Sequence, residues 1–82
     1  MELTGNHIKA ARALLGIEQA QLSELSGVSI NTIRTQEACG DQPVAGYAST
    51  RDKVQQALEG LGIEFTNGNS PGVRWVRKGK RK

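Results

Sequence analysis

The residues able to do nucleophilic, acid–base or metal chemistry are few, and their spacing does not group them. His7 and Cys39 are the only histidine and the only cysteine of the chain. One cysteine excludes an internal disulfide, and one cysteine with one histidine cannot build a four-ligand structural zinc site. No nucleophile, base and orienting group occur together. We therefore expect no enzyme activity, metal or cofactor, and we interpret His7 as an exposed residue near a helix start and Cys39 as a small loop or core residue.

Length and hydropathy narrow the class of protein further. A chain of 82 residues has room for one small domain, and such a domain buries only about 60 % of the surface that its unfolded chain exposes. No run reaches the roughly 18 apolar residues that a membrane span requires. Residues 1–6 lack the basic and apolar regions of a secretory signal. We expect a cytoplasmic protein that makes no membrane contact.

The charge is divided unequally along the chain, whose net charge is +3. Residues 1–72 hold five Lys and Arg against eight Asp and Glu, a net charge of −3. Residues 73–82 hold six Lys and Arg and no acid, a net charge of +6. Basic charge favours a polyanionic partner, but a mildly acidic body with a basic end is weaker evidence for nucleic acid than a uniformly basic fold. We expect a domain over residues 1–76 and a mobile basic tail over 77–82.

The elements that would position any functional side chain are mostly helices. Apolar residues recur at three- and four-residue spacing in four segments, each bounded by residues that favour a helix end. Ser29 and Ser49 are the expected N-caps of the third and fourth helices. The fourth helix is expected to turn Leu61 inward and to close at Gly62. The expected helices cover residues 8–15, 19–26, 30–37 and 50–61.

Two other segments have different patterns. Residues 38–47 contain two glycines, an aspartate and a proline, which predicts a loop. After residue 62 the apolar period becomes two, because Ile63 and Phe65 alternate with polar residues, and Val73 and Trp75 do so after a turn-forming stretch. This pattern predicts a β-hairpin. A lone hairpin is marginal in water, so it must lie on the helices or pair with another chain.

The most informative segment covers the second and third expected helices, residues 19–34. Gly27 permits a tight turn between them, and Leu22 and Ile33 are placed to lock the two helices at a fixed angle. The solvent face of the second helix of such a pair is left free to read DNA.

This segment resembles the phage repressor and Cro superfamily, often called XRE helix-turn-helix regulators. The resemblance runs from about residue 8 to residue 40, and the segments at 62–65 and 72–75 are similar to the tail of small bacterial members. The positions that carry it are Gln19, Leu22, Gly27, Val28, Ser29, Ile33 and Glu37. The resemblance implies a four-helix, repressor-like bundle, and we assign the chain to the all-α class with a C-terminal hairpin and a basic tail.

The resemblance also implies roles for individual residues. An arginine of the first helix pairs with the glutamate that ends the third, which here implies an ion pair between Arg12 and Glu37. Side chains at the start of the third helix read bases in the family. Asn31 would then bond adenine, Arg34 would grip guanine, and Ile30 would pack on a thymine methyl group. The full set of expected base contacts is Ile30, Asn31, Arg34 and Thr35.

Phosphate contacts are expected at the helix starts and in the tail. For the tail, a phosphate-contacting arm is favoured over a solubilising end or a weak membrane-surface patch. The expected phosphate contacts are Gln19, Ser29, Thr32, Lys78, Lys80 and Arg81.

Three positions depart from the family pattern. Ser23 replaces the usual alanine at the helix crossing, and Gln36 replaces the usual apolar residue. Glu18 lies close to an expected phosphate, and Arg34 is the only cation of the second and third helices.

Two functions follow from the sequence. The first is a transcriptional regulator that binds double-stranded DNA as a homodimer, on an inverted repeat, through the third helix in the major groove. The second is a protein-binding helix-turn-helix module that sequesters another regulatory protein without binding DNA. The net negative charge of residues 1–72 and the few cations of the third helix favour this alternative.

Overall fold

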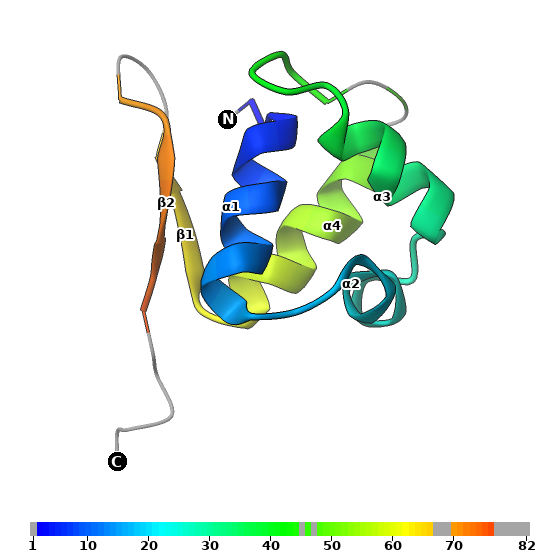
Figure 1. Cartoon of the computed structure of the whole chain (residues 1–82), viewed down its shortest axis with the longest axis horizontal. Helices are drawn as coiled ribbons and strands as arrows, with labels where there is room; N and C mark the ends of the chain where they lie inside the picture. The colour runs from blue at the N-terminus through cyan, green and yellow to red at the C-terminus, as the bar shows by residue number, and fades with distance from the viewer. Residues whose placement is uncertain (1, 45, 47, 67–69, 77–82) are drawn as a thin grey trace.

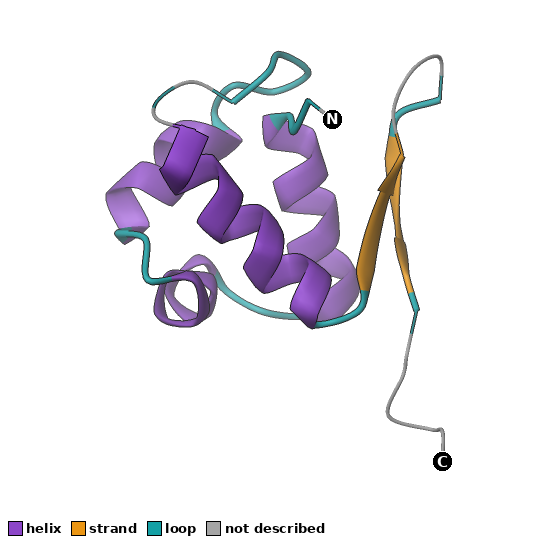
Figure 2. Ribbon diagram, turned by 180° about the vertical axis from the view of Figure 1, so that it is seen from behind, coloured by secondary structure: helices purple, strands orange, loops and turns teal. Residues whose placement is uncertain are grey.

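The structure, a computed structural model, describes residues 2–44, 46, 48–66 and 70–76. Four helices precede a two-stranded antiparallel sheet (Figure 1). The helices gather around one core, and the hairpin lies beside α1 on the side away from α2 and α3 (Figures 1 and 2). The elements are α1 (Gly5–Leu15), α2 (Gln19–Ser26), α3 (Ile30–Glu37), α4 (Ala48–Gly60), β1 (Ile63–Thr66) and β2 (Gly72–Trp75).

The expected all-α class is wrong, because the hairpin is part of the packed fold. The hairpin that the alternation predicts is present, and strands β1 and β2 pair with Ile63 opposite Trp75 and Phe65 opposite Val73. Ile63 is buried, and the other three side chains pack partly buried against the helical core. Strand β2 lies on α1 and β1 on α4. The sequence interpretation named the class from the four helices alone and left open whether the hairpin lies on them or on another chain; its apolar face packs against the helical core.

Helices α2 and α3 agree with the sequence prediction, and their ends have the expected chemistry. Gly27 ends α2 in the left-handed region at φ 75°, which glycine adopts without a steric penalty. The Ser29 hydroxyl caps α3 by accepting from the Thr32 N–H at 3.2 Å. Leu22 and Ile33 are fully buried between the helices, as expected. The turn between them is therefore fixed by one glycine, one cap and two core contacts.

Helix α4 differs from the prediction at both ends. It begins at Ala48, so Ser49 lies inside the helix and does not cap it. It ends at Gly60, and Leu61 follows in the turn with 38 % of its surface exposed. The Leu61 carbonyl accepts a hydrogen bond from Trp75 Nε1 at 3.1 Å, so this residue holds the hairpin through its backbone. Val54 and Leu58 carry the buried stripe of the helix.

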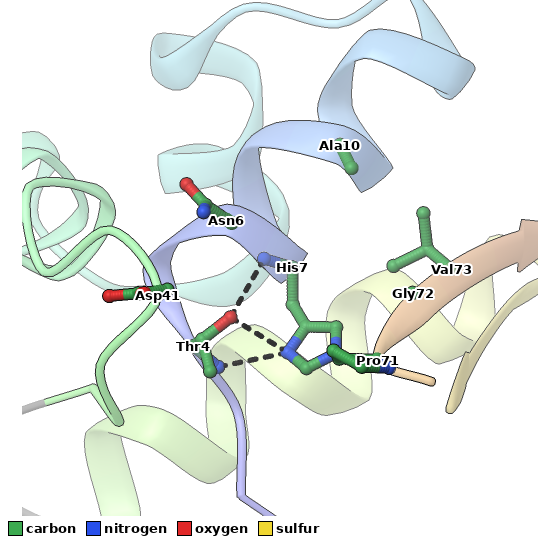
Figure 3. Close-up of a pocket in the computed structure, with 8 residues that line it drawn as sticks. All are labelled: Thr4, Asn6, His7, Ala10, Asp41, Pro71, Gly72 and Val73. Carbon is green, nitrogen blue, oxygen red and sulfur yellow. Dashed lines mark hydrogen bonds between the residues drawn. The ribbon is translucent and has the colours of Figure 1, made fainter. Parts of the chain in front are cut away.

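The interpretation of His7 as an exposed residue is wrong. Helix α1 begins three residues earlier than expected, with Thr4 as its N-cap, and His7 is only 3 % exposed. The Thr4 N–H donates to His7 Nδ1 at 3.0 Å (Figure 3). Since Nδ1 accepts a hydrogen bond, the neutral ring carries its proton on Nε2, which donates to the Thr66 carbonyl at 3.1 Å. His7 therefore joins the first turn of α1 to the end of β1.

The same region contains a small cavity between the start of α1, Asp41 and the start of β2 (Figure 3). Its volume is about 250 Å³, which lies below the roughly 300–1,000 Å³ of typical small-molecule sites. Both ring nitrogens of His7 already bond within the protein. We assign no ligand to this cavity.

The start of α1 lies directly against the end of α3. A Cβ atom added to Gly5 would lie 2.6 Å from the carbonyl oxygens of Gln36 and Glu37, closer than atoms can approach. The Asn6 N–H also donates to the Gly40 carbonyl at 2.8 Å. Gly5 therefore permits a backbone contact that sets where α3 ends relative to α1.

Gln36 is buried in this contact region although its side chain is polar. The residue is 1 % exposed, and its Oε1 has no hydrogen-bond partner among the described residues. A buried acceptor without a partner costs about 1–3 kcal/mol. This explains in physical terms why an apolar residue would suit the position.

We expect Gln36→Met, which keeps the side-chain length and removes the orphaned oxygen, to raise the free energy of unfolding by about 1–3 kcal/mol. Urea unfolding followed by circular dichroism measures this change. Gln56→Met, on the exposed side of α4, is the matched control and is expected to stay within about 0.5 kcal/mol. A loss of stability in Gln36→Met would show that Oε1 is satisfied in solution.

Candidate functional site

The candidate site is the outward face of α3 together with the start of α2. Ile33, Gln36 and Glu37 are the buried residues of α3, so its opposite face is presented to solvent. Asn31, Arg34 and Thr35 are exposed on that face, and Ile30 is half-buried at its beginning. The structure thus brings the four expected base-contacting residues onto one short helix.

Ser23 stabilises the turn that presents this face. Its hydroxyl donates to the Val28 carbonyl at 2.6 Å, which fastens α2 to the residues before α3. An alanine at this position could not make that bond. The departure from the family pattern therefore has a structural role, and sequence reasoning treated it only as an anomaly.

An ion pair between the half-buried Arg12 and the buried Glu37 holds the inner side of the site. Arg12 Nε lies 2.6 Å from Glu37 Oε2, and Arg12 Nη2 donates to Glu37 Oε1 at 3.0 Å. Arg12 Nη1 also donates to the Ile17 carbonyl at 3.0 Å. One guanidinium group therefore ties α1 to the end of α3 and to the link that precedes α2.

The pKa values of the pair follow from this geometry. Burial of Glu37 would by itself raise its pKa, but hydrogen bonds from Arg12 and Gln19 and the charge of Arg12 hold the pKa below its ordinary value. The hydrogen bond to Glu37 raises the pKa of Arg12. Both groups are therefore charged at neutral pH, and each neutralises the other.

Gln19 connects this pair to the exposed face. Its Nε2 donates to Glu37 Oε1 at 3.0 Å, and its Oε1 accepts from Arg34 Nε at 3.4 Å. Arg34 Nη1 donates to Asn31 Oδ1 at 3.5 Å. A continuous chain of hydrogen bonds therefore runs from the buried carboxylate to the surface of α3. Sequence reasoning placed Gln19 at a phosphate and did not foresee this chain, which spacing alone does not reveal.

The remaining expected phosphate contacts divide into two groups. Ser29 and Thr32 lie together, with the Ser29 hydroxyl donating to Thr32 Oγ1 at 2.9 Å. Lys78, Lys80 and Arg81 lie outside the described residues. The strand that leads to them, β2, is at the opposite end of the molecule from α3 (Figures 1 and 2).

The charge around the face is mixed. Arg34 is the only Lys or Arg of α2 and α3, while Glu18 and Glu24 are exposed on the α2 side. Glu37 contributes little net charge, because Arg12 neutralises it.

The described residues contain no group of three or more His, Cys, Asp or Glu that could hold a metal ion. Within the same part of the chain, no helix has both the length and the apolar character that crossing a bilayer demands.

We expect the ion pair to make stability depend on acid pH. The pKa of Glu37 is lower in the folded protein than in the unfolded chain, where it is about 4.3. Its contribution is therefore fully present above the unfolded pKa and is lost as the pH falls through the folded pKa. Glu37→Gln is expected to cost, at pH 7, the lower end of the roughly 3–5 kcal/mol of a broken buried pair, because Arg12 keeps some contact with solvent.

Urea unfolding at pH 7 and at pH 3 measures this effect. The stability gap between the native protein and Glu37→Gln is expected to shrink at the lower pH. Glu24→Gln, on the exposed side of α2, is the control and should show a small gap at both pH values. A Glu37→Gln gap that is equal at the two pH values would contradict the assignment.

No family model matches the chain, and no curated protein matches it. The resemblance to the repressor-like family therefore depends on the quoted residues alone, and the function has to be argued from the geometry of α2 and α3.

Proposed function

We propose that the protein is a transcriptional regulator that binds specific DNA sequences, with α3 placed in the major groove. The observation that carries this proposal is the division of α3 into a buried face and an outward face with three exposed hydrogen-bonding side chains. An α-helix with its side chains is about 10–12 Å in diameter. The major groove of B-DNA is about 12 Å wide and admits one such helix.

The side chains on the face match the chemistry of base edges. Arg34 can donate two parallel hydrogen bonds to guanine, and the Asn31 amide can donate to and accept from adenine. The half-buried Ile30 offers an apolar surface to a thymine methyl group. Thr35 already donates its hydroxyl to the Asn31 carbonyl at 3.0 Å, so its oxygen remains available as an acceptor.

Binding as a homodimer to an inverted repeat forms part of the proposal. One small module makes too few contacts for specific occupancy of a site. Two half-sites read from the same side of the duplex are about 34 Å apart. The described part of the chain measures 38 × 32 × 20 Å, so two adjoining copies have the right size to span that distance.

A second candidate function is a module that binds another regulatory protein and does not bind DNA. Leu25 on α2 favours it, because 55 % of this large apolar residue is exposed. The neighbouring Glu24 and the single cation of α2 and α3 also suit a protein partner better than a phosphate backbone. This candidate requires that the amide signals of α3 stay unchanged when duplex from the upstream region of its own gene is added.

Arg34→Ala tests base reading. A preferred duplex is first selected from random sequence with the native protein, and affinities are then measured by fluorescence anisotropy. We expect the variant to lose about 1–3 kcal/mol of binding free energy on this duplex and to relax preference at one base pair. Lys53→Ala, an exposed cation on α4, is the control. An equal loss on every sequence would show that Arg34 contacts only phosphate, and no binding at low salt would refute the proposed function.

Replacing Lys78, Lys80 and Arg81 by glutamine tests the tail. If the three cations bind phosphates, affinity should fall on all sequences. The slope of log affinity against log salt should then decrease by roughly 0.9 for each phosphate that is no longer neutralised. A slope equal to that of the native protein would remove the tail from the interface.

A further inference from the structure

The amide of Gln19 has a fixed orientation, because one of its neighbours can only accept hydrogen bonds. The ionised Glu37 carboxylate has no proton to donate, so the Gln19 group that faces it at 3.0 Å has to be the NH₂. Turning the amide over would place two oxygens against each other. The buried acid therefore determines that Gln19 presents its oxygen toward the outward face.

Arg34 lies against that oxygen. Its Nε donates to Gln19 Oε1, and its Nη1 donates to Asn31 Oδ1 on the other side. Two acceptors on different parts of the guanidinium group restrict both its position and its plane. Since Nε donates to Gln19 and one Nη1 proton to Asn31, the protons left for an incoming ligand are the other one on Nη1 and the two on Nη2.

This arrangement matters because Arg34 is exposed. An exposed arginine samples many rotamers, and fixing them on binding opposes the interaction. Holding the side chain in place beforehand reduces that loss and also selects the ligand geometry that it accepts. The planar fork of arginine discriminates well only when it meets two acceptors in its own plane.

We propose that Gln19 is a positioning residue for Arg34. Gln19 contacts no base, yet it determines how well Arg34 discriminates at the base pair that Arg34 reads. The buried Glu37 fixes the orientation of the Gln19 amide, and that amide in turn orients Arg34 at the surface. This inference rests on the proposed function. The alternative role for the Gln19 side chain is a phosphate contact, which would raise affinity equally on all sequences.

Gln19→Met separates the two roles, because methionine has a similar length and no amide. Affinities are measured by fluorescence anisotropy on the preferred duplex and on a duplex changed at the base pair that Arg34→Ala identifies. We expect the ratio of the two affinities to fall roughly 3- to 10-fold, in the lower part of the range for directly coupled side chains. In the Arg34→Ala background, Gln19→Met should leave the ratio unchanged.

Two controls guard against a merely structural effect. Gln21→Met makes the same substitution on the same helix at a residue whose Oε1 accepts from the Glu18 N–H at 2.8 Å. It should leave the ratio of affinities unchanged. Circular dichroism at the binding temperature checks that each variant is folded. An equal loss on both duplexes, or the same loss in the Arg34→Ala background, would overturn the inference in favour of phosphate contact.

A measurement without DNA distinguishes this inference from the proposed function. In the free native protein, the Arg34 Nε–H bond to Gln19 should slow hydrogen exchange with water, which nitrogen-15 NMR detects. Gln19→Met should speed that exchange, and Gln21→Met should not. An unchanged Nε–H signal in Gln19→Met would overturn the positioning role alone. Failure of the native protein to bind any duplex would overturn the proposed function, and base discrimination by Gln19 with it.

Discussion

The carboxylate of Glu37 is the group around which the helices are arranged. It is 4 % exposed, and a charge so far from water is tolerated only when it is paired and hydrogen-bonded. Arg12 supplies the charge from α1, and Gln19 supplies a further donor from α2. Three helices therefore meet where their side chains satisfy one buried acid. The close backbone approach at Gly5 fixes the distance at which they can do so.

The rest of the fold keeps this junction in place. Ser23 and the Ser29 cap hold the turn between α2 and α3, so the buried residues of α3 stay aligned with α1. On the other side of α1, the apolar face of the hairpin packs against the core. Glu64 and Arg74 pair on the exposed face of the sheet. Such an exposed pair contributes little stability, which is consistent with a sheet held by its inner face.

The sequence predicted the elements whose signals are local. The period of apolar residues, Gly27 and Ser29 were enough to place α2 and α3, and the alternation after residue 62 was enough to predict the hairpin. The sequence did not reveal features that depend on distant partners. His7 is buried because β1 lies beside it, and Gln36 is buried although its side chain is polar. That the hairpin lies on the helices was one of two alternatives that the sequence left open, and the structure shows it packed on α1. On the candidate site, spacing placed four side chains on α3, but the bonds of Gln19 to Glu37 and Arg34 arise only when three helices meet.

The hydrogen bond from His7 to the Thr66 carbonyl links residues 59 positions apart. His7 also accepts the Thr4 N–H at the first turn of α1. The hairpin therefore cannot separate from the helices without uncovering this imidazole and weakening the helix cap. The first turn of α1 and the end of β1 both form hydrogen bonds with the His7 ring. They should therefore unfold together as a single cooperative unit and not fray independently.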